Sequence, residues 1–290
     1  MRTETEMMEL ILSAAKKDER IRAVYMNGSR TNPNAPKDLF QDYDIVYVVR
    51  ETESFQQDKT WIDQFGRRLY MQFPEESVEF PSDPHNSYGW LMQFADGNRL
   101  DLHVNRVEYA QQSIKHDRLC IILLDKDGCL PSMPPPTDAD FFVAAPTEKE
   151  FLDTCNQFWW CLNNVGKGLW RKEIPYAQDM MTFIREELLK ILSWKAGIHK
   201  NFSCSIGKSG KYLFRFISPQ EWQDFLSTYS SADVENCWQA AINMCRLFDT
   251  TAKFVAGKLG FCYNMQEADA SFHFFLHVRS LPADAKEIYP

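Results

Sequence analysis

A proline-rich segment near the middle of the chain divides the sequence into two parts of different character. The segment from Leu130 to Thr137 contains four prolines, and it cannot form a helix or a central strand, because proline lacks the backbone donor and restricts the preceding residue. The chain has 290 residues, so each part is long enough to build its own hydrophobic core. We therefore expect two domains, at residues 1–135 and 146–290.

The two parts differ in hydrophobic periodicity. In the first part, residues 7–17 have a helical pattern, and short apolar runs typical of strands lie at 21–26, 44–49, 99–104 and 119–124. In the second part, Thr147 and Ser218 each begin a capping box, and the helical period continues over 176–197 and 233–258. This pattern predicts an α+β chain, in which an N-terminal mixed sheet with helices is followed by a C-terminal helical bundle.

Composition and charge exclude several classes of protein. Asp and Glu total 40 against 32 Lys and Arg, a net charge of −8, whereas proteins that bind nucleic acid normally carry a basic surface. No run of about 18 apolar residues predicts a membrane span, and the N-terminal stretch MRTETEMMELIL carries charges where a signal peptide is apolar. We expect a monomeric cytoplasmic protein that binds neither nucleic acid nor membranes.

Residues suited to chemistry gather after the first predicted strand. That strand runs into Gly28 and Ser29, and a glycine just before a helix lets the backbone approach a phosphate closely. Asp42 and Asp44 follow about a dozen residues later and, being two apart on an extended strand, share one face. Neighbouring carboxylates repel each other unless a cation neutralises them, and Mg²⁺ prefers carboxylates together with phosphate oxygens. The pattern predicts a site for nucleotide phosphates and metal ions.

A third carboxylate is expected from a neighbouring strand. Asp101 lies at the start of an otherwise apolar strand, where an unpaired charge would be costly to bury. In the second part, Lys167 and Arg171 are four residues apart, so on a helix they share one face. They either meet the β- and γ-phosphates of a nucleotide or form a solvated basic edge.

Five stretches of the sequence carry a family likeness, at 18–22, 28–32, 40–45, 123–127 and 167–174. They resemble the nucleotidyltransferase superfamily and, within it, the aminoglycoside 6-adenylyltransferases, the streptomycin-modifying group. The Gly-Ser-Arg-Thr-Asn and Lys-Gly-Leu-x-Arg-x-Glu-Ile stretches are more specific to that group than the metal motif, and the likeness spans nearly the whole chain. The chain departs from the family at Asn27, where an acidic residue is typical, and at 262–266.

The resemblance implies transfer of AMP from ATP to a hydroxyl of an aminoglycoside, streptomycin at its 6-position, with release of pyrophosphate. It implies that Asp42 and Asp44 hold Mg²⁺, and that Asp101 completes the metal shell or acts as general base, the role we favour. The helical domain would complete the ATP and aminoglycoside site. The residues expected to contact ATP are Gly28, Ser29, Arg30, Lys167 and Arg171.

A cationic aminoglycoside suits carboxylates and aromatic faces. The resemblance and the local sequence favour five residues as acceptor contacts, although the aromatic ones are equally expected in a core: Glu79, Trp170, Glu173, Tyr176 and Asp179. Glu75 and Glu76 are expected to be solvated. Two alternatives stay open, an adenylyltransferase of the same fold with a different hydroxylated acceptor and a non-catalytic nucleotide-binding relative.

Overall fold

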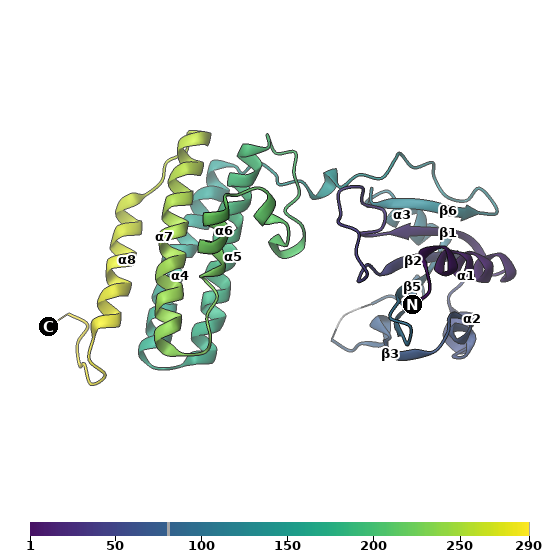
Figure 1. Cartoon of the computed structure of the whole chain (residues 1–290), viewed down its shortest axis with the longest axis horizontal. Coiled ribbons are helices and arrows are strands. Elements are labelled where there is room, and N and C mark those ends of the chain that lie inside the picture. Colours follow the sequence, from purple (N-terminus) through teal and green to yellow (C-terminus); the bar gives the residue numbers. More distant parts are fainter. Residues whose placement is uncertain (80–81, 290) are drawn as a thin grey trace. The chain divides into compact units, whose positions relative to one another are not determined.

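The computed structural model describes residues 1–79 and 82–289 (Figure 1). It consists of two compact units that meet in the chain between Asp140 and Phe141. The first unit is built on a sheet and the second is helical, so the predicted α+β class is confirmed.

The first unit contains a six-stranded mixed sheet in the order β3-β4-β5-β2-β1-β6. Strands β2 and β5 are parallel, whereas the other neighbours are antiparallel. The helices and strands are α1 (Glu4–Lys17), β1 (Ile21–Asn27), β2 (Tyr43–Val49), α2 (Glu53–Gln57), β3 (Arg68–Gln72), β4 (Ser87–Phe94), β5 (Arg99–Arg106), α3 (Val107–Ser113) and β6 (Cys120–Asp125). Short 3₁₀ turns lie at Trp61–Phe65, Pro74–Glu76 and Ala139–Phe141.

The two faces of the sheet pack against different helices. Tyr43, Ile45 and Tyr47 of β2 belong to one core with residues of α1, whereas Val46 and Val48 belong to another core with residues of α3. Successive strand residues point to opposite faces, so Asp44 lies on the face opposite to α1.

Four strands predicted from the sequence are confirmed with shifted ends, and two strands were not anticipated. Strand β3 lies at the edge of the sheet and exposes Leu69 and Tyr70, so it lacks an alternating pattern. Residues 28–42, which connect β1 to β2, form turns and irregular backbone, so Gly28 opens a loop and not a helix. Helix α1 begins at Glu4 rather than residue 7, since Thr3 caps it in a capping box with Glu6.

The second unit is a helical bundle. Its helices are α4 (Glu148–Trp170), α5 (Ile174–His199), α6 (Pro219–Leu226), α7 (Val234–Leu259) and α8 (Met265–Ser280). Helix α4 packs against α5 and α8, and α5 packs against α7. Both predicted capping boxes, at Thr147 and Ser218, are confirmed. Within the described residues, no helix combines the length and apolarity that a membrane crossing requires.

Candidate active site

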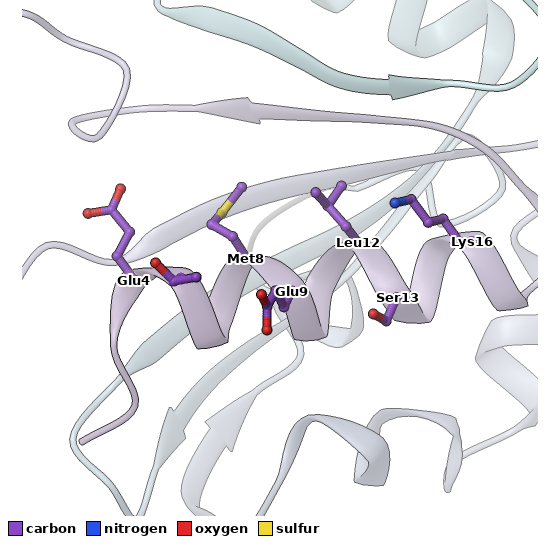
Figure 2. A pocket seen from close by; sticks show the side chains of 7 residues that line it. Glu4, Met8, Glu9, Leu12, Ser13 and Lys16 are labelled. Carbon is purple, nitrogen blue, oxygen red and sulfur yellow. The ribbon is translucent and has the colours of Figure 1, made fainter.

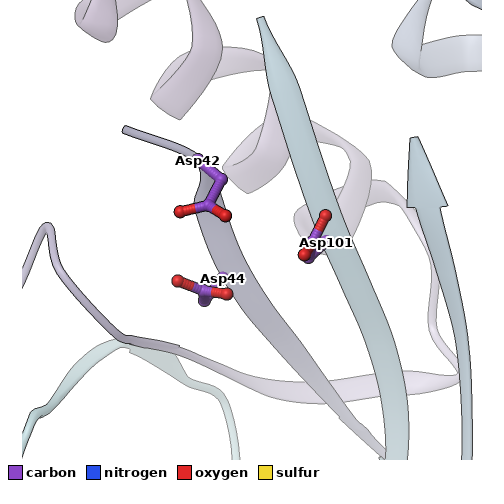
Figure 3. Close-up of side chains that lie close together, drawn as sticks. All are labelled: Asp42, Asp44 and Asp101. Atoms are coloured by element: carbon purple, nitrogen blue, oxygen red, sulfur yellow. The ribbon is translucent and has the colours of Figure 1, made fainter. Parts of the chain in front are cut away.

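Three carboxylates meet on the face of the sheet opposite to α1. Asp42 directly precedes β2, Asp44 lies within β2, and Asp101 lies on the adjacent parallel strand β5 (Figure 3). Asp44 and Asp101 are direct partners in the register of the two strands. One carboxylate oxygen from each of the three residues lies within 4.8 Å of the others. Parallel pairing therefore brings together side chains that are more than 50 residues apart in the sequence.

The electrostatics of this carboxylate cluster favour a cation. Burial of Asp44, together with repulsion from Asp42 and Asp101, raises the pKa of its carboxyl to about 7. The cluster also attracts a cation of the protein itself. The Arg99 guanidinium donates to both oxygens of Asp101, at 2.8 and 2.6 Å, and its Nε lies 3.8 Å from Asp42. These carboxylates, mainly Asp101, hold the pKa of Arg99 above its usual value.

Gly28 lies directly against the cluster. Its backbone has a φ of +78°, and a Cβ at this position would lie 2.0 Å from Oδ2 of Asp44. No other residue type fits here without displacing that carboxylate. The Gly28 carbonyl accepts hydrogen bonds from the backbone and hydroxyl of Thr31, which tighten the turn after β1.

Arg30 points into its own loop. Its Nε donates to the Asp42 carbonyl at 2.9 Å, its Nη2 donates to the Gln41 carbonyl at 2.8 Å, and its guanidinium lies 3.7 Å from the centre of the Tyr43 ring. Gln41 in turn donates to the Ser29 carbonyl at 3.3 Å. These contacts orient the backbone that carries Asp42, a role that the sequence did not suggest; contact of Ser29 and Arg30 with ATP stays a prediction.

Asn27 is the register partner of Asp44 on β1. Its side-chain amide donates to Asp117 at 3.1 Å. Its buried Oδ1 has no hydrogen-bond partner within residues 1–79 and 82–289. The three carboxylates offer oxygen ligands alone, which is the donor set that Mg²⁺ prefers, and Asn27 adds its buried Oδ1 on the strand next to Asp44. The residues of the cluster therefore fit a magnesium site.

Two residues of this face, Arg99 and His103, were not predicted from the sequence. The signal was the alternation along β5, in which Arg99, Asp101 and His103 interleave with the apolar Leu100, Leu102 and Val104.

The expectation that Glu75 is solvated is wrong. Its side chain is only 12% exposed, and it accepts a hydrogen bond from the Gly89 amide at 2.8 Å. Glu79, by contrast, is exposed.

The remaining predicted site residues belong to the helical unit and cluster at the turn between α4 and α5. Lys167 lies in the last turn of α4, and Arg171 is its C-cap. The Arg171 guanidinium lies 3.9 Å from Glu173, and both side chains are about half exposed. The aromatic side chains are Trp170, whose Nε1 donates to the Leu281 carbonyl at 3.2 Å, and Tyr176, which is 41% exposed. Asp179 is exposed on α5.

A shallow hollow of about 510 Å³ lies elsewhere, along α1 (Figure 2). Its lining comes from that helix alone, in the residues Glu4, Thr5, Met8, Glu9, Leu12, Ser13 and Lys16. It includes none of the predicted site residues. The carboxylate cluster, rather than this hollow, is the candidate active site.

Comparisons with known proteins agree over most of the chain. A family model described as streptomycin adenylyltransferase matches residues 1–278. An aminoglycoside 6-adenylyltransferase of Bacillus subtilis (strain 168) is 39% identical over 91% of this chain and 93% of its own length. One from Campylobacter jejuni is 38% identical over 93% and 94%. A crystal structure of an aminoglycoside 6-adenyltransferase from Bacillus subtilis, 33% identical, aligns with a TM-score of 0.48 and covers 97% of this chain and 100% of that one.

Proposed function

The chain belongs to the streptomycin adenylyltransferase family, and we propose that it transfers AMP from ATP to a hydroxyl of an aminoglycoside, with streptomycin and its 6-position as the acceptor. The observation that carries the proposal is the cluster of Asp42, Asp44 and Asp101 with Gly28 packed against it. An idle protein has no reason to hold three repelling carboxylates together.

Asp42 and Asp44 would hold Mg²⁺. When bound, the cation neutralises the triphosphate and stabilises charge that develops on the phosphorus and the leaving group. The turn at Gly28 and Ser29 offers backbone amides to the phosphates, and Arg99 offers a half-exposed guanidinium on the same face. From the resemblance, Arg30, Lys167 and Arg171 are the other proposed phosphate contacts.

Asp101 is the proposed general base. The hydroxyl oxygen of the acceptor bonds to the α-phosphorus while the bond from that phosphorus to the bridging oxygen breaks, and pyrophosphate leaves. The hydroxyl proton moves to a carboxylate oxygen of Asp101, whose side chain Arg99 orients through two hydrogen bonds. The proposed acceptor contacts carried over from the sequence are Glu79, Trp170, Glu173, Tyr176 and Asp179.

A mass spectrum of streptomycin after incubation with the protein, ATP and Mg²⁺ tests the function. We expect a gain of one AMP, which EDTA prevents. A panel of other aminoglycosides and hydroxylated metabolites belongs in the same experiment, because Asn27 departs from the family pattern beside the cluster. An unmodified panel at full protein stability would contradict the proposal.

Variants of the cluster test which residues carry the reaction. Asp42→Asn and Asp44→Asn should each lower pyrophosphate release by about a thousandfold or more, because each removes a charge that the metal requires. Asp38→Asn is the matched control, since Asp38 is an exposed carboxylate of the same loop outside the cluster. Retained turnover in both cluster variants would contradict the proposal.

A further inference from the structure

A partly buried histidine–glutamate pair lies beside the carboxylate cluster, and the proposed chemistry does not use it. His103 follows Asp101 by two residues on β5, so both side chains are on the same face of the sheet. The side chain of Glu75 approaches His103 from the 3₁₀ turn Pro74–Glu76, which packs against β4. The charged oxygen Oε1 of Glu75 lies 3.6 Å from Nε2 of His103.

Gly89 makes the room for this pair. It is the register partner of His103 on β4, and a Cβ there would lie 2.4 Å from Cδ2 and 2.5 Å from Nε2 of the imidazole. The ring therefore lies across the glycine backbone. The pairing of β3 with β4 extends only to Leu91, and Glu75 accepts the hydrogen bond of the Gly89 amide instead. The Glu75 carboxylate thus accepts from a backbone amide just beyond the β3–β4 pairing and also faces the imidazole of His103.

The arrangement leaves one edge of the imidazole for a ligand. The edge formed by Cδ2 and Nε2 faces Gly89 and Glu75, so Nδ1 is on the opposite edge. A ligand that reaches His103 therefore meets Nδ1, a ring nitrogen that can form a hydrogen bond with a hydroxyl. No hydrogen bond to this nitrogen comes from the parts of the chain that the structure describes, and the side chain is 28% exposed.

We infer that His103 binds a hydroxyl of the aminoglycoside acceptor next to Asp101, and that Glu75 is the positioning residue for its ring. The inference rests on the proposed function. An acceptor that presents one hydroxyl to Asp101 carries others on the same sugar, and His103 lies one side-chain step further along the same strand face. The pair therefore extends the site from the reacting hydroxyl toward the rest of the acceptor.

Steady-state kinetics of His103→Ala, Glu75→Ala and the double variant test this inference. We expect each single variant to raise the KM for the acceptor by about tenfold, the effect of one lost hydrogen bond to a polar ligand. The kcat and the KM for ATP should not change, because the contact is the same in the bound substrate and in the transition state. The double variant should be no worse than either single one, since the two residues act as a unit.

Two sets of controls separate this role from a structural one. Glu75→Gln still accepts from the Gly89 amide and should recover most of the acceptor KM. Glu76→Gln alters the neighbouring carboxylate, which accepts from Tyr88 instead of facing His103. His85→Ala alters a second histidine–glutamate pair of the same unit, in which His85 lies 2.7 Å from Glu53. Both variants should leave kcat and both KM values unchanged.

The outcomes distinguish the inference from the function on which it rests. An unchanged acceptor KM in His103→Ala, with normal transfer by the wild type, contradicts the inference alone. If the variants instead lower kcat, raise the KM values for the acceptor and for ATP equally and lower the thermal midpoint, the pair is merely structural. That result would contradict the inference as well. A wild type that modifies no aminoglycoside contradicts the proposed function and the inference with it.

Discussion

At the scale of single residues, Gly28 links the conformation of the chain to the position of a carboxylate. Its φ of +78° is a conformation that costs other residue types about 1–2 kcal/mol. Because Gly28 has no side chain, the Asp44 carboxylate can lie directly against its backbone. A substitution at Gly28 therefore has two separable costs, one in backbone strain and one in the displacement of Asp44.

Gly28→Ala should combine both costs. We expect turnover to fall by about a hundredfold, the usual effect of displacing a catalytic group by about 1 Å. Gly128→Ala is the matched control, because Gly128 has a φ of +64° but no atom within 4 Å of the added Cβ. It should lower the free energy of unfolding by about 1 kcal/mol and leave turnover unchanged. Equal turnover in the two variants would contradict the role of Gly28.

The ion pair between Arg2 and Asp96 predicts a pH-dependent contribution to stability. Partial burial would raise the pKa of Asp96, but hydrogen bonds from Arg2 and Asn98 outweigh it and hold that pKa well below its usual value. A carboxyl with a lowered folded-state pKa stabilises the fold fully above its unfolded pKa of about 3.9. This contribution is lost as the pH falls below that value toward the folded-state pKa.

Asp96→Asn should therefore lower the free energy of unfolding by about 2 kcal/mol at pH 7, because it removes a charged hydrogen-bond acceptor. At pH 3 the difference from wild type should be about 1 kcal/mol smaller. Urea unfolding at both pH values measures it. Asp63→Asn, which alters a pair with Arg68 on a 60% exposed side chain, should have little effect at either pH. A difference that grows toward pH 3 would contradict the sign of the shift.

At the scale of elements, a hydrogen-bond chain joins α4, α7 and the segment before α8. Trp159 donates its Nε1 to the Tyr263 hydroxyl at 3.1 Å, and that hydroxyl donates to Asp249 at 3.1 Å. Tyr263→Phe leaves the Trp159 donor without its partner, so we expect the free energy of unfolding to fall by about 1–3 kcal/mol. Tyr229→Phe is the control, because the Tyr229 ring is 57% exposed. Equal stability of the two variants in urea unfolding would contradict the role of this chain.

Sequence reasoning succeeded where the signals were local. The capping boxes at Thr147 and Ser218 marked the starts of α4 and α6, because the side chain and the amide that pair there are three residues apart. It failed for β4, where Tyr88, Gly89 and Trp90 are buried in succession, so the strand shows no clean alternation of apolar and polar residues. Glu75 was misjudged for another reason, since the Gly89 amide that pairs with it lies 14 residues away in the chain. The carboxylate cluster could be predicted because β2 and β5 each carry their own strand pattern.

At the scale of the whole molecule, the two units have separate hydrophobic cores. Separate cores predict two components in the thermal unfolding of the chain, measured by calorimetry. Asp96→Asn should lower the component of the first unit, and Tyr263→Phe should lower that of the second. In the double variant both shifts should appear, each of the size seen in the single variant, because the sites share no partner. A single transition that both variants shift equally would contradict this independence.

The parallel register of β2 and β5 limits how this site can change during evolution. Asp44 and Asp101 meet because the two strands pair in a register that places these two residues opposite each other. Insertion or deletion of one residue within either strand, ahead of its carboxylate, would turn that carboxylate to the face of the sheet that packs against α1. A substitution on these strands changes one side chain, whereas a change of length would separate the cluster. Lineages that keep the activity should therefore accumulate substitutions along β2 and β5 while conserving the lengths of both strands.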